Sequence, residues 1–446
     1  MSGVSGVEQE RGVEEERAGG AELEERGLIA ARIREALAGP AHPVALRGAR
    51  KVDASGVTDG FWLVTSGERI EVCGVADGAH GGVDGGVTAF DIACIEYGVA
   101  PSDIIDAAGF VLVPGYVDIH AHGAWGAAFD DGMDGIEMAR AGHMMHGTTR
   151  QVLSLITNPV DTLRENLATV RGLMGSRPDI LGSHLEGPFL ALSRKGAHDP
   201  QCLKDPEPEL VEQLLEAADG SLRQITIAPE LPHGLSAIRQ FTAAGVVPAV
   251  GHCDADYAMA GQGFDAGARI MTHMFNAMNG LHHRKPGPIP AAVEDPRVII
   301  ELINDGFHVD NAMLKLGLGF APHRIAFVTD AMSATDCPDG HYLLGALDVN
   351  VEDGHARLVS NGAIAGSTLT LEKAVQRAVV ELGMAPADAV EAATLTPARA
   401  LGLEKANAVT EYPLGLLASG YAADFNLLDA DTWAVRSVWC AGRRVK

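Results

Sequence analysis

Between residues 116 and 330, short apolar runs of strand length alternate with amphipathic segments of helical periodicity. One such segment carries Leu163, Leu167 and Val170 on a single face. Strands that alternate with helices form parallel sheets, and eight such units close into a (β/α)8 barrel, a TIM-like α/β fold. The eight predicted strands are residues 116–120, 149–153, 180–186, 224–228, 247–252, 269–273, 298–303 and 325–330.

The segments on either side of this region have a different pattern. Residues 44–113 contain short strand-like runs with a glycine-rich hairpin region at 74–86, and alternating runs return near the C-terminus. We expect the two flanks to pair into one small, discontinuous β-sandwich domain. Its predicted parts are residues 44–113 and 406–446, and the barrel takes residues 114–405.

Residues 1–43 resemble neither pattern. Their first part is rich in Glu, Gly, Ala and Arg, and such a composition buries too little apolar surface to offset the entropy of ordering. We therefore predict a mobile acidic extension, in which residues 21–37 have the spacing of a short helix. A second addition is predicted at residues 340–365, as a hairpin inserted after the eighth barrel strand.

Charge and composition exclude several classes of partner. The chain has 34 Lys and Arg against 59 Asp and Glu, a net charge of −25, so a nucleic-acid backbone would repel it. We find neither an apolar run of membrane-spanning length nor a signal-peptide core. The six cysteines form no CxxC pair and are typical of reduced thiols. We expect a cytoplasmic protein that acts on small molecules and binds neither nucleic acid nor membrane.

Metal-capable side chains stand at the ends of five predicted strands, where barrel enzymes place their active sites. His120 and His122 are two residues apart, so both imidazoles project from one face of a strand. One HxH pair is a weak signal, but the coincidence of five strand ends predicts a site for zinc or a similar ion. The other strand-end side chains are Glu186, His252, His273 and Asp330.

The motifs around these residues resemble the N-acetylglucosamine-6-phosphate deacetylases of the amidohydrolase superfamily. The resemblance covers about residues 114–403, together with the closing ADFNLLD. It implies hydrolysis of N-acetylglucosamine 6-phosphate to glucosamine 6-phosphate and acetate. The matching motifs, in order, are PGYVDIHAHG, HLEGPFL, KGAH, GHCDADY, THMFNAM, DGFHVD, VTDAM, IAGSTLTL and ATLTPARALGL.

The resemblance also implies which residues hold metal. Glu186, His252 and His273 match the ligands present throughout the family, and His120 with His122 matches a second-metal pair that some members lack. Two divalent ions per chain are therefore expected, with zinc as the first choice and iron, cobalt or manganese as alternatives.

Catalytic and substrate-binding roles follow from the same resemblance. Asp330 matches the catalytic acid/base, placed also to contact metal, and His198 matches a residue that polarises the substrate carbonyl. The family further implies a homodimer in which phosphate-binding groups lie near the partner subunit. Residues that match contacts to the sugar phosphate are Asn276, Ala277, Arg284, His308, Ile364, Ala365 and Gly366.

Two alternatives remain open. Dihydroorotase-like enzymes and N-acyl-amino-acid deacylases usually carry a lysine on strand four, but residues 224–228 contain none, and Glu186 can supply a bridging carboxylate instead. A catalytically inactive barrel scaffold would typically have lost a ligand or the acid, and this chain keeps them. Without the motifs, Arg284 would be read as a surface arginine and His308 as a structural histidine.

Overall fold

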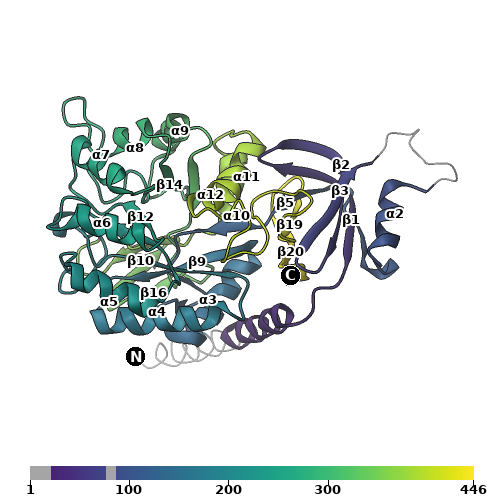
Figure 1. Cartoon of the computed structure of the whole chain (residues 1–446), viewed down its shortest axis with the longest axis horizontal. Coiled ribbons are helices and arrows are strands. Elements are labelled where there is room, and N and C mark those ends of the chain that lie inside the picture. Colours follow the sequence, from purple (N-terminus) through teal and green to yellow (C-terminus); the bar gives the residue numbers. More distant parts are fainter. Residues whose placement is uncertain (1–21, 77–86) are drawn as a thin grey trace, which may run out of the picture.

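The computed structural model describes residues 22–76 and 87–446, and it contains the predicted barrel (Figure 1). The barrel strands are β6 (Tyr116–Asp118), β9 (Thr148–Ile156), β10 (Ile180–Glu186), β11 (Leu222–Ile227), β12 (Val247–Val250), β13 (Ile270–Met271), β14 (Ile299–Ile303) and β15 (Ile325–Val328). They run in the order β15-β14-β13-β12-β11-β10-β9-β6, and each ladder is parallel. β9 and β10 are buried at every residue, because helices cover the outer face and side chains fill the inside.

The first and last strands stand at the two ends of this order, and the barrel is nearly closed between them. The backbone N–H of Asp330 donates to the carbonyl oxygen of His120 at 2.8 Å. Residues 118–126 and 329–337, which meet along this line, are called the seam below. The seam lies at the carboxyl ends of the strands, where the active site is expected.

Helices surround the barrel, and one of them buries the predicted stripe. Leu163, Leu167 and Val170 are buried, and so are Leu371, Ala374, Val375 and Ala378 of a later helix. In the described part of the chain no helix has the length and apolar character of a membrane span. The helices are α3 (Gly132–Met145), α4 (Val160–Met174), α5 (Pro208–Ala218), α6 (Gly234–Ala243), α7 (Tyr257–Ala266), α8 (Ile289–Glu294), α9 (Asn311–Phe320), α10 (Leu371–Val380), α11 (Pro386–Ala393) and α12 (Leu395–Ala400).

The second domain is a β-sandwich built from both flanks of the barrel, as predicted. Its strands are β1 (Val44–Asp53), β2 (Gly56–Ser66), β3 (Arg69–Val75), β4 (Ile104–Asp106), β5 (Phe110–Pro114), β19 (Phe425–Asp429), β20 (Val435–Cys440) and β21 (Arg443–Arg444). β5 pairs antiparallel with β19 and joins the two flanks. The domain also contains a helix that was not predicted, α2 (Ala89–Glu96), and most of the expected hairpin region falls on residues 77–86, outside the described residues.

Part of the predicted mobile extension is ordered. Residues 22–38 form a helix, the purple ribbon at the lower edge of Figure 1, and Ala30, Ile33 and Leu37 are buried in the main hydrophobic core. Mobility was the wrong prediction for this helix, because its apolar face finds a surface to cover. The helical spacing was the better guide. Residues 1–21 lie outside the described residues.

The insertion after the eighth strand has one strand more than a hairpin. It is an antiparallel sheet of β16 (Gly340–Leu344), β17 (Leu347–Glu352) and β18 (His355–Leu358), called the inserted sheet below. Its apolar face packs on Ile156 and on Met332 and Ala334 of the seam. The sheet therefore sits directly on the residues that follow Asp330.

Candidate metal centre and active site

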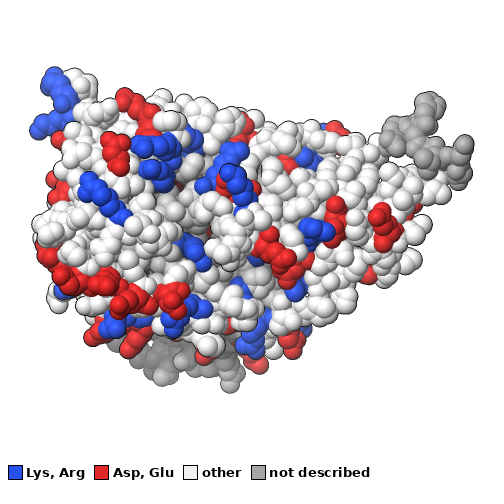
Figure 2. Space-filling view, viewed as in Figure 1, with Lys and Arg blue, Asp and Glu red and all other residues white. Residues whose placement is uncertain are grey.

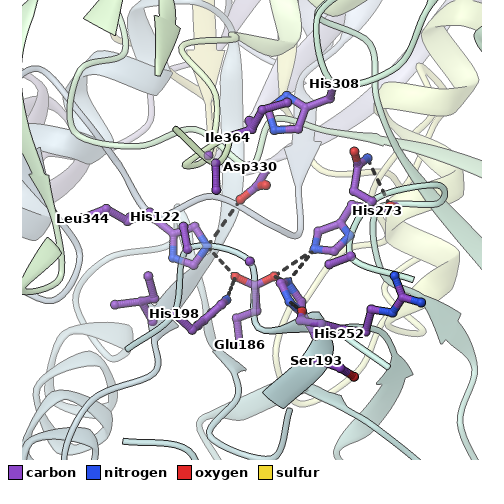
Figure 3. Close-up of a pocket in the computed structure, with 18 residues that line it drawn as sticks. His122, Glu186, Ser193, His198, His252, His273, His308, Asp330, Leu344 and Ile364 are labelled. Atoms are coloured by element: carbon purple, nitrogen blue, oxygen red, sulfur yellow. Dashed lines mark hydrogen bonds and ion pairs between the residues drawn. The ribbon is translucent and has the colours of Figure 1, made fainter. Parts of the chain in front are cut away.

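A cavity of about 350 Å³ opens at the carboxyl ends of the barrel strands (Figure 3). It lies where the sequence analysis expected an active site. The predicted site residues that line it are His122, Glu186, His198, His252, His273, Asn276, Ala277, His308, Asp330, Ile364 and Gly366.

Glu186, at the end of β10, is the centre of the cluster. Its Oε1 lies 3.1 Å from Nε2 of both His252 and His273, and its Oε2 lies 3.1 Å from Nε2 of His122. The Nε2 atoms of His252 and His273 also face each other at 3.0 Å. Imidazole nitrogens that converge on one carboxylate are a typical ligand set for a divalent ion of the zinc type.

A second group of ligand atoms shares Glu186. His120, His122, Glu186 and Asp330 each offer one atom, and these atoms lie within 4.8 Å of one another. Nε2 of His120 is buried and makes no hydrogen bond among the described residues. A buried polar atom without a partner is costly, so this nitrogen fits a cation. The carboxylate of Glu186 is thus common to both groups of ligand atoms.

The electrostatics of the cluster favour positive charge. Burial opposes protonation of His122, but hydrogen bonds to Asp330 and Glu186 outweigh it and raise the pKa of His122 to about 9. Burial alone would raise the pKa of Asp330, yet the neighbouring His120 and His122 hold it below its usual range. A divalent cation supplies the same positive charge, and protons therefore compete with metal for this site.

Glu301 orients two of the ligands, and the sequence analysis missed it. Its Oε2 lies 3.0 Å from Nδ1 of His120 and accepts the backbone N–H of His273 at 3.2 Å. Gln224 donates to Oε1 at 2.7 Å. Carboxylates behind a ligating histidine fix its tautomer, so Nε2 of His120 is turned toward Glu186 and Asp330. The available sequence signal was a single glutamate inside the apolar run IIELI, which forms β14.

Three site residues adopt strained backbone conformations at their strand ends. His252, His273 and Asp330 have φ of 45°, 23° and 48°, which non-glycine residues rarely adopt. Such strain is typical of functional sites. Gly366, with φ of 65°, allows its loop to approach this point, because a Cβ there would lie 3.0 Å from the carbonyl oxygen of Asp330.

His198 and His184 have different surroundings. Nδ1 of His198 is 2.9 Å from the Thr157 hydroxyl and Nε2 is 3.4 Å from Glu186, a position that also suits a metal ligand. Burial lowers the pKa of His198 to about 4, so the ring is neutral at neutral pH. Both nitrogens of His184 are bonded, to Ser154 at 2.8 Å and to a threonine at 2.9 Å, in keeping with a structural role.

The opposite wall of the cavity carries two of the residues expected to bind the sugar phosphate. In Figure 3, His308 and Ile364 lie on the side of Asp330 away from Glu186. Nδ1 of His308 pairs with Asp305 at 2.6 Å, an interaction that fixes the orientation of the ring. Ala365 is fully buried behind this wall and does not line the cavity.

Two arginines differ from expectation. Arg284 is exposed and lines a separate outer hollow with Tyr257 and Lys285, away from the cavity. Arg194, which was not predicted, does line the cavity and is held by Asp254 at 2.8 Å. Its position immediately before the KGAH motif was the only sequence signal.

Comparison with known proteins agrees with this geometry. Residues 111–445 match the amidohydrolase family. The chain belongs to that family. Amidohydrolases of this kind are metal-dependent enzymes that act on amide bonds, and the ligand cluster suits that chemistry.

Individual relatives are more specific. This amidohydrolase is 35% identical over 358 residues to N-acetylgalactosamine-6-phosphate deacetylase of Escherichia coli O157:H7, covering 79% of this chain and 92% of the relative. It is 34% identical to N-acetylglucosamine-6-phosphate deacetylase of Vibrio furnissii, covering 77% and 85%. A Mycobacterium smegmatis N-acetyl-D-glucosamine-6-phosphate deacetylase mutant, solved with N-acetyl-D-glucosamine-6-phosphate, aligns with a TM-score of 0.80 and 36% identity over 91% of this chain and 99% of that one.

Proposed function

We propose that this amidohydrolase hydrolyses N-acetylglucosamine 6-phosphate to glucosamine 6-phosphate and acetate. The observation that carries the proposal is one cavity that holds the Glu186 ligand cluster on one side and His308 on the other (Figure 3). That arrangement suits an amide at the cluster and an anionic group at the opposite wall. The relatives named above act on substrates of this kind.

The cofactor we infer is a pair of divalent ions, with zinc as the first choice. His252 and His273 with Glu186 would hold one ion, and His120 and His122 with the same carboxylate would hold the other. Bound ions of this type polarise a carbonyl and activate water.

Asp330 supplies the proton transfers. Its pKa lies below the usual range, so the carboxylate is ionised at neutral pH and accepts the proton of the attacking water. The same carboxyl then delivers that proton to the nitrogen of glucosamine 6-phosphate, which would otherwise be a poor leaving group. We assign His198 to the acetyl end and His308 with Asn276 to the sugar phosphate, since all three line the cavity.

A homodimer accounts for the position of Arg284. Because this side chain is exposed and outside the cavity of its own chain, we infer that it reaches the phosphate bound by the partner subunit. A guanidinium provides a planar fork that suits phosphate. We also place the enzyme in the cytoplasm, where its six unpaired cysteines would stay reduced.

Acetate release from three sugars tests the substrate. We expect kcat/KM to be highest for N-acetylglucosamine 6-phosphate and far lower for unphosphorylated N-acetylglucosamine. N-acetylgalactosamine 6-phosphate is the second candidate, since the E. coli relative is named for it. A higher kcat/KM for that epimer would replace the proposed substrate, and equal rates with and without phosphate would remove the phosphate from the proposal.

Metal removal tests the cofactor. We expect prolonged chelation to abolish acetate release and added zinc to restore it, because the ligands of the cluster converge on positions for a cation. Elemental analysis of the same samples gives the number of ions per chain. Full turnover by protein verified to be metal-free would contradict the mechanism.

A further inference from the structure

The seam is held by backbone hydrogen bonds between the residues that follow His122 and those that follow Asp330. The N–H of His122 donates to the carbonyl oxygen of Ala331 at 2.7 Å. Further along, the N–H of Trp125 donates to the carbonyl oxygen of Thr335 at 3.0 Å. His122 and Asp330 both belong to the second group of ligand atoms (His120, His122, Glu186 and Asp330), called the second metal group below. Because the seam links them, the position of His122 depends on that of Asp330.

The far end of the seam is strained and needs support. Trp125 and Asp336 both have φ of 55°, a conformation that costs free energy for residues other than glycine. The indole Nε1–H of Trp125 donates to the Asp336 carboxylate at 2.7 Å. This contact couples the two strained residues to each other.

Arg26, on the N-terminal helix of residues 22–38, contacts this end of the seam from outside. Its guanidinium donates to the carbonyl oxygen of Asp336 at 2.6 Å and to Sγ of Cys337 at 3.0 Å. It also lies over the ring of Trp125, 5.5 Å from the centroid, in a cation–π contact. The side chain is 14% exposed, so these contacts are shielded from water.

The helix that carries Arg26 lies outside the region matched by the family, which begins at residue 111. Family membership therefore gives Arg26 no role. Its helix is anchored independently, because Ala30, Ile33 and Leu37 are buried in the main core. The helix is anchored, and its Arg26 guanidinium contacts residues from both segments of the seam. We call this arrangement the clamp.

We propose that Arg26 is a positioning residue for the second metal group: by clamping the seam, it keeps His122 and Asp330 at metal-binding spacing. Nε2 of His122 and Oδ1 of Asp330 are 3.5 Å apart. The inference rests on the metal centre of the proposed function, and not on the identity of the substrate. Arg26 touches neither ligand and acts only through the residues that follow them.

Metal retention tests the clamp. The zinc-loaded full chain is dialysed against a graded series of chelator concentrations, and the ions kept per chain are counted. Supporting residues directly behind ligands typically change metal affinity 10–100-fold. Arg26 does not contact the ligands themselves, so its effect should be smaller. For Arg26→Met we expect about 3–10-fold lower affinity for one ion. Arg26→Lys keeps the charge without the fork and should recover part of the loss.

Two controls separate positioning from general destabilisation. Arg32→Met changes an exposed arginine on the same helix and should retain metal like the wild type. In a His122→Ala/Asp330→Ala background, which lacks both ligands on the seam, Arg26→Met should cause no further loss. If Arg26→Met fails to fold, Arg26→Lys and Trp125→Phe, which deletes the Nε1–H donor, carry the same comparison.

Several outcomes would overturn the inference. These are equal metal loss in Arg26→Met and Arg32→Met, an additional loss in the His122→Ala/Asp330→Ala background, or a wild type that binds no second ion. Because no substrate is present, these results are independent of the activity assay. If Arg26→Met deacetylated normally and retained the second ion like the wild type, the proposed function would stand and the role of Arg26 would be refuted.

Discussion

At the scale of single residues, Glu186 decides what the centre can hold. Its carboxylate lies 3.1 Å from three imidazoles and belongs to both groups of ligand atoms. It therefore links the two groups. Asp330 differs because it stands at the cavity surface, 9% exposed, with its charge maintained by neighbouring histidines. We therefore assign ligation alone to Glu186, whereas Asp330 both offers a ligand atom and transfers the proton.

Asp330→Asn separates the two roles. The amide keeps the shape of the side chain but neither accepts nor returns a proton. We expect kcat to fall by at least a factor of about 10²–10⁴, the range typical of general acid–base groups, while substrate still binds. Steady-state acetate release and a direct binding measurement check this. Turnover within a few-fold of the wild type would make Asp330 a structural residue.

Most ligands were predictable because strand periodicity and strand ends are encoded locally. His120 and His122 follow from their two-residue spacing, and Glu186 follows from its place after an apolar run. Glu301 was not predictable in the same way, because its importance comes from contacts made across the barrel to His120 and His273. The location of Arg284 depends on folding of an exposed loop, which the motif does not describe.

At the scale of elements, packing explains which predictions failed. The helix of residues 22–38 looked too polar to order, yet it needs only three buried side chains because the barrel supplies the rest of the surface. α2 escaped notice because it is only eight residues long and buries just three side chains, although Thr88 and Asp91 form a capping box at its start. The helix α4 was the easy case, since it is 15 residues long and buries the predicted stripe.

His146 joins three elements and gives a pH-dependent contribution to stability. It ends α3 and pairs with Asp336 at 3.2 Å and with Glu372 of α10. Burial opposes its protonation, but the hydrogen bonds to both carboxylates outweigh it and raise the pKa of His146 to about 9. An unfolded histidine has a pKa of about 6.5. The contribution is therefore complete below pH about 6.5 and is lost as pH rises through about 9.

Thermal unfolding of His146→Gln across pH checks this. We expect the variant to be less stable by on the order of 2 kcal/mol near pH 6 and nearly equal to the wild type near pH 10. His341→Gln, at an exposed histidine, is the matched control and should show little difference at either pH. A His146→Gln deficit that stays constant from pH 6 to pH 10 would show that lost packing, and not charge, is responsible.

At the scale of the whole molecule, the charge distribution works against the proposed substrate. The net charge is −25, and Figure 2 shows acidic side chains in a band over α4 and α5. The exposed acids of α5 include Glu209, Glu212 and Glu216. An anion is repelled at long range, so its selection must come from short-range donors in or beside the cavity. Basic groups contributed by a second subunit would meet that requirement.

A mixed dimer tests whether Arg284 acts across subunits. One chain carries Asp330→Asn and the other Arg284→Ala, each inactive or impaired alone on the phosphorylated sugar. If Arg284 serves the partner, one pocket in each mixed dimer keeps both groups, and we expect about half the wild-type kcat/KM per dimer. If it served its own pocket, both pockets would be damaged. The same mixture of Asp330→Asn with Arg32→Met provides the matched control.

The pairing of β5 with β19 also determines how long β5 stays unpaired while the chain is synthesised. The end of β5 at Pro114 and the start of β19 at Phe425 are 311 residues apart. At ribosomal speeds of about 5–20 residues per second, β5 waits roughly 15–60 s for the strand that will cover its edge. Uncovered apolar edges recruit other chains. Aggregation during synthesis should therefore start from the small domain, even though the barrel is the larger and more complicated structure.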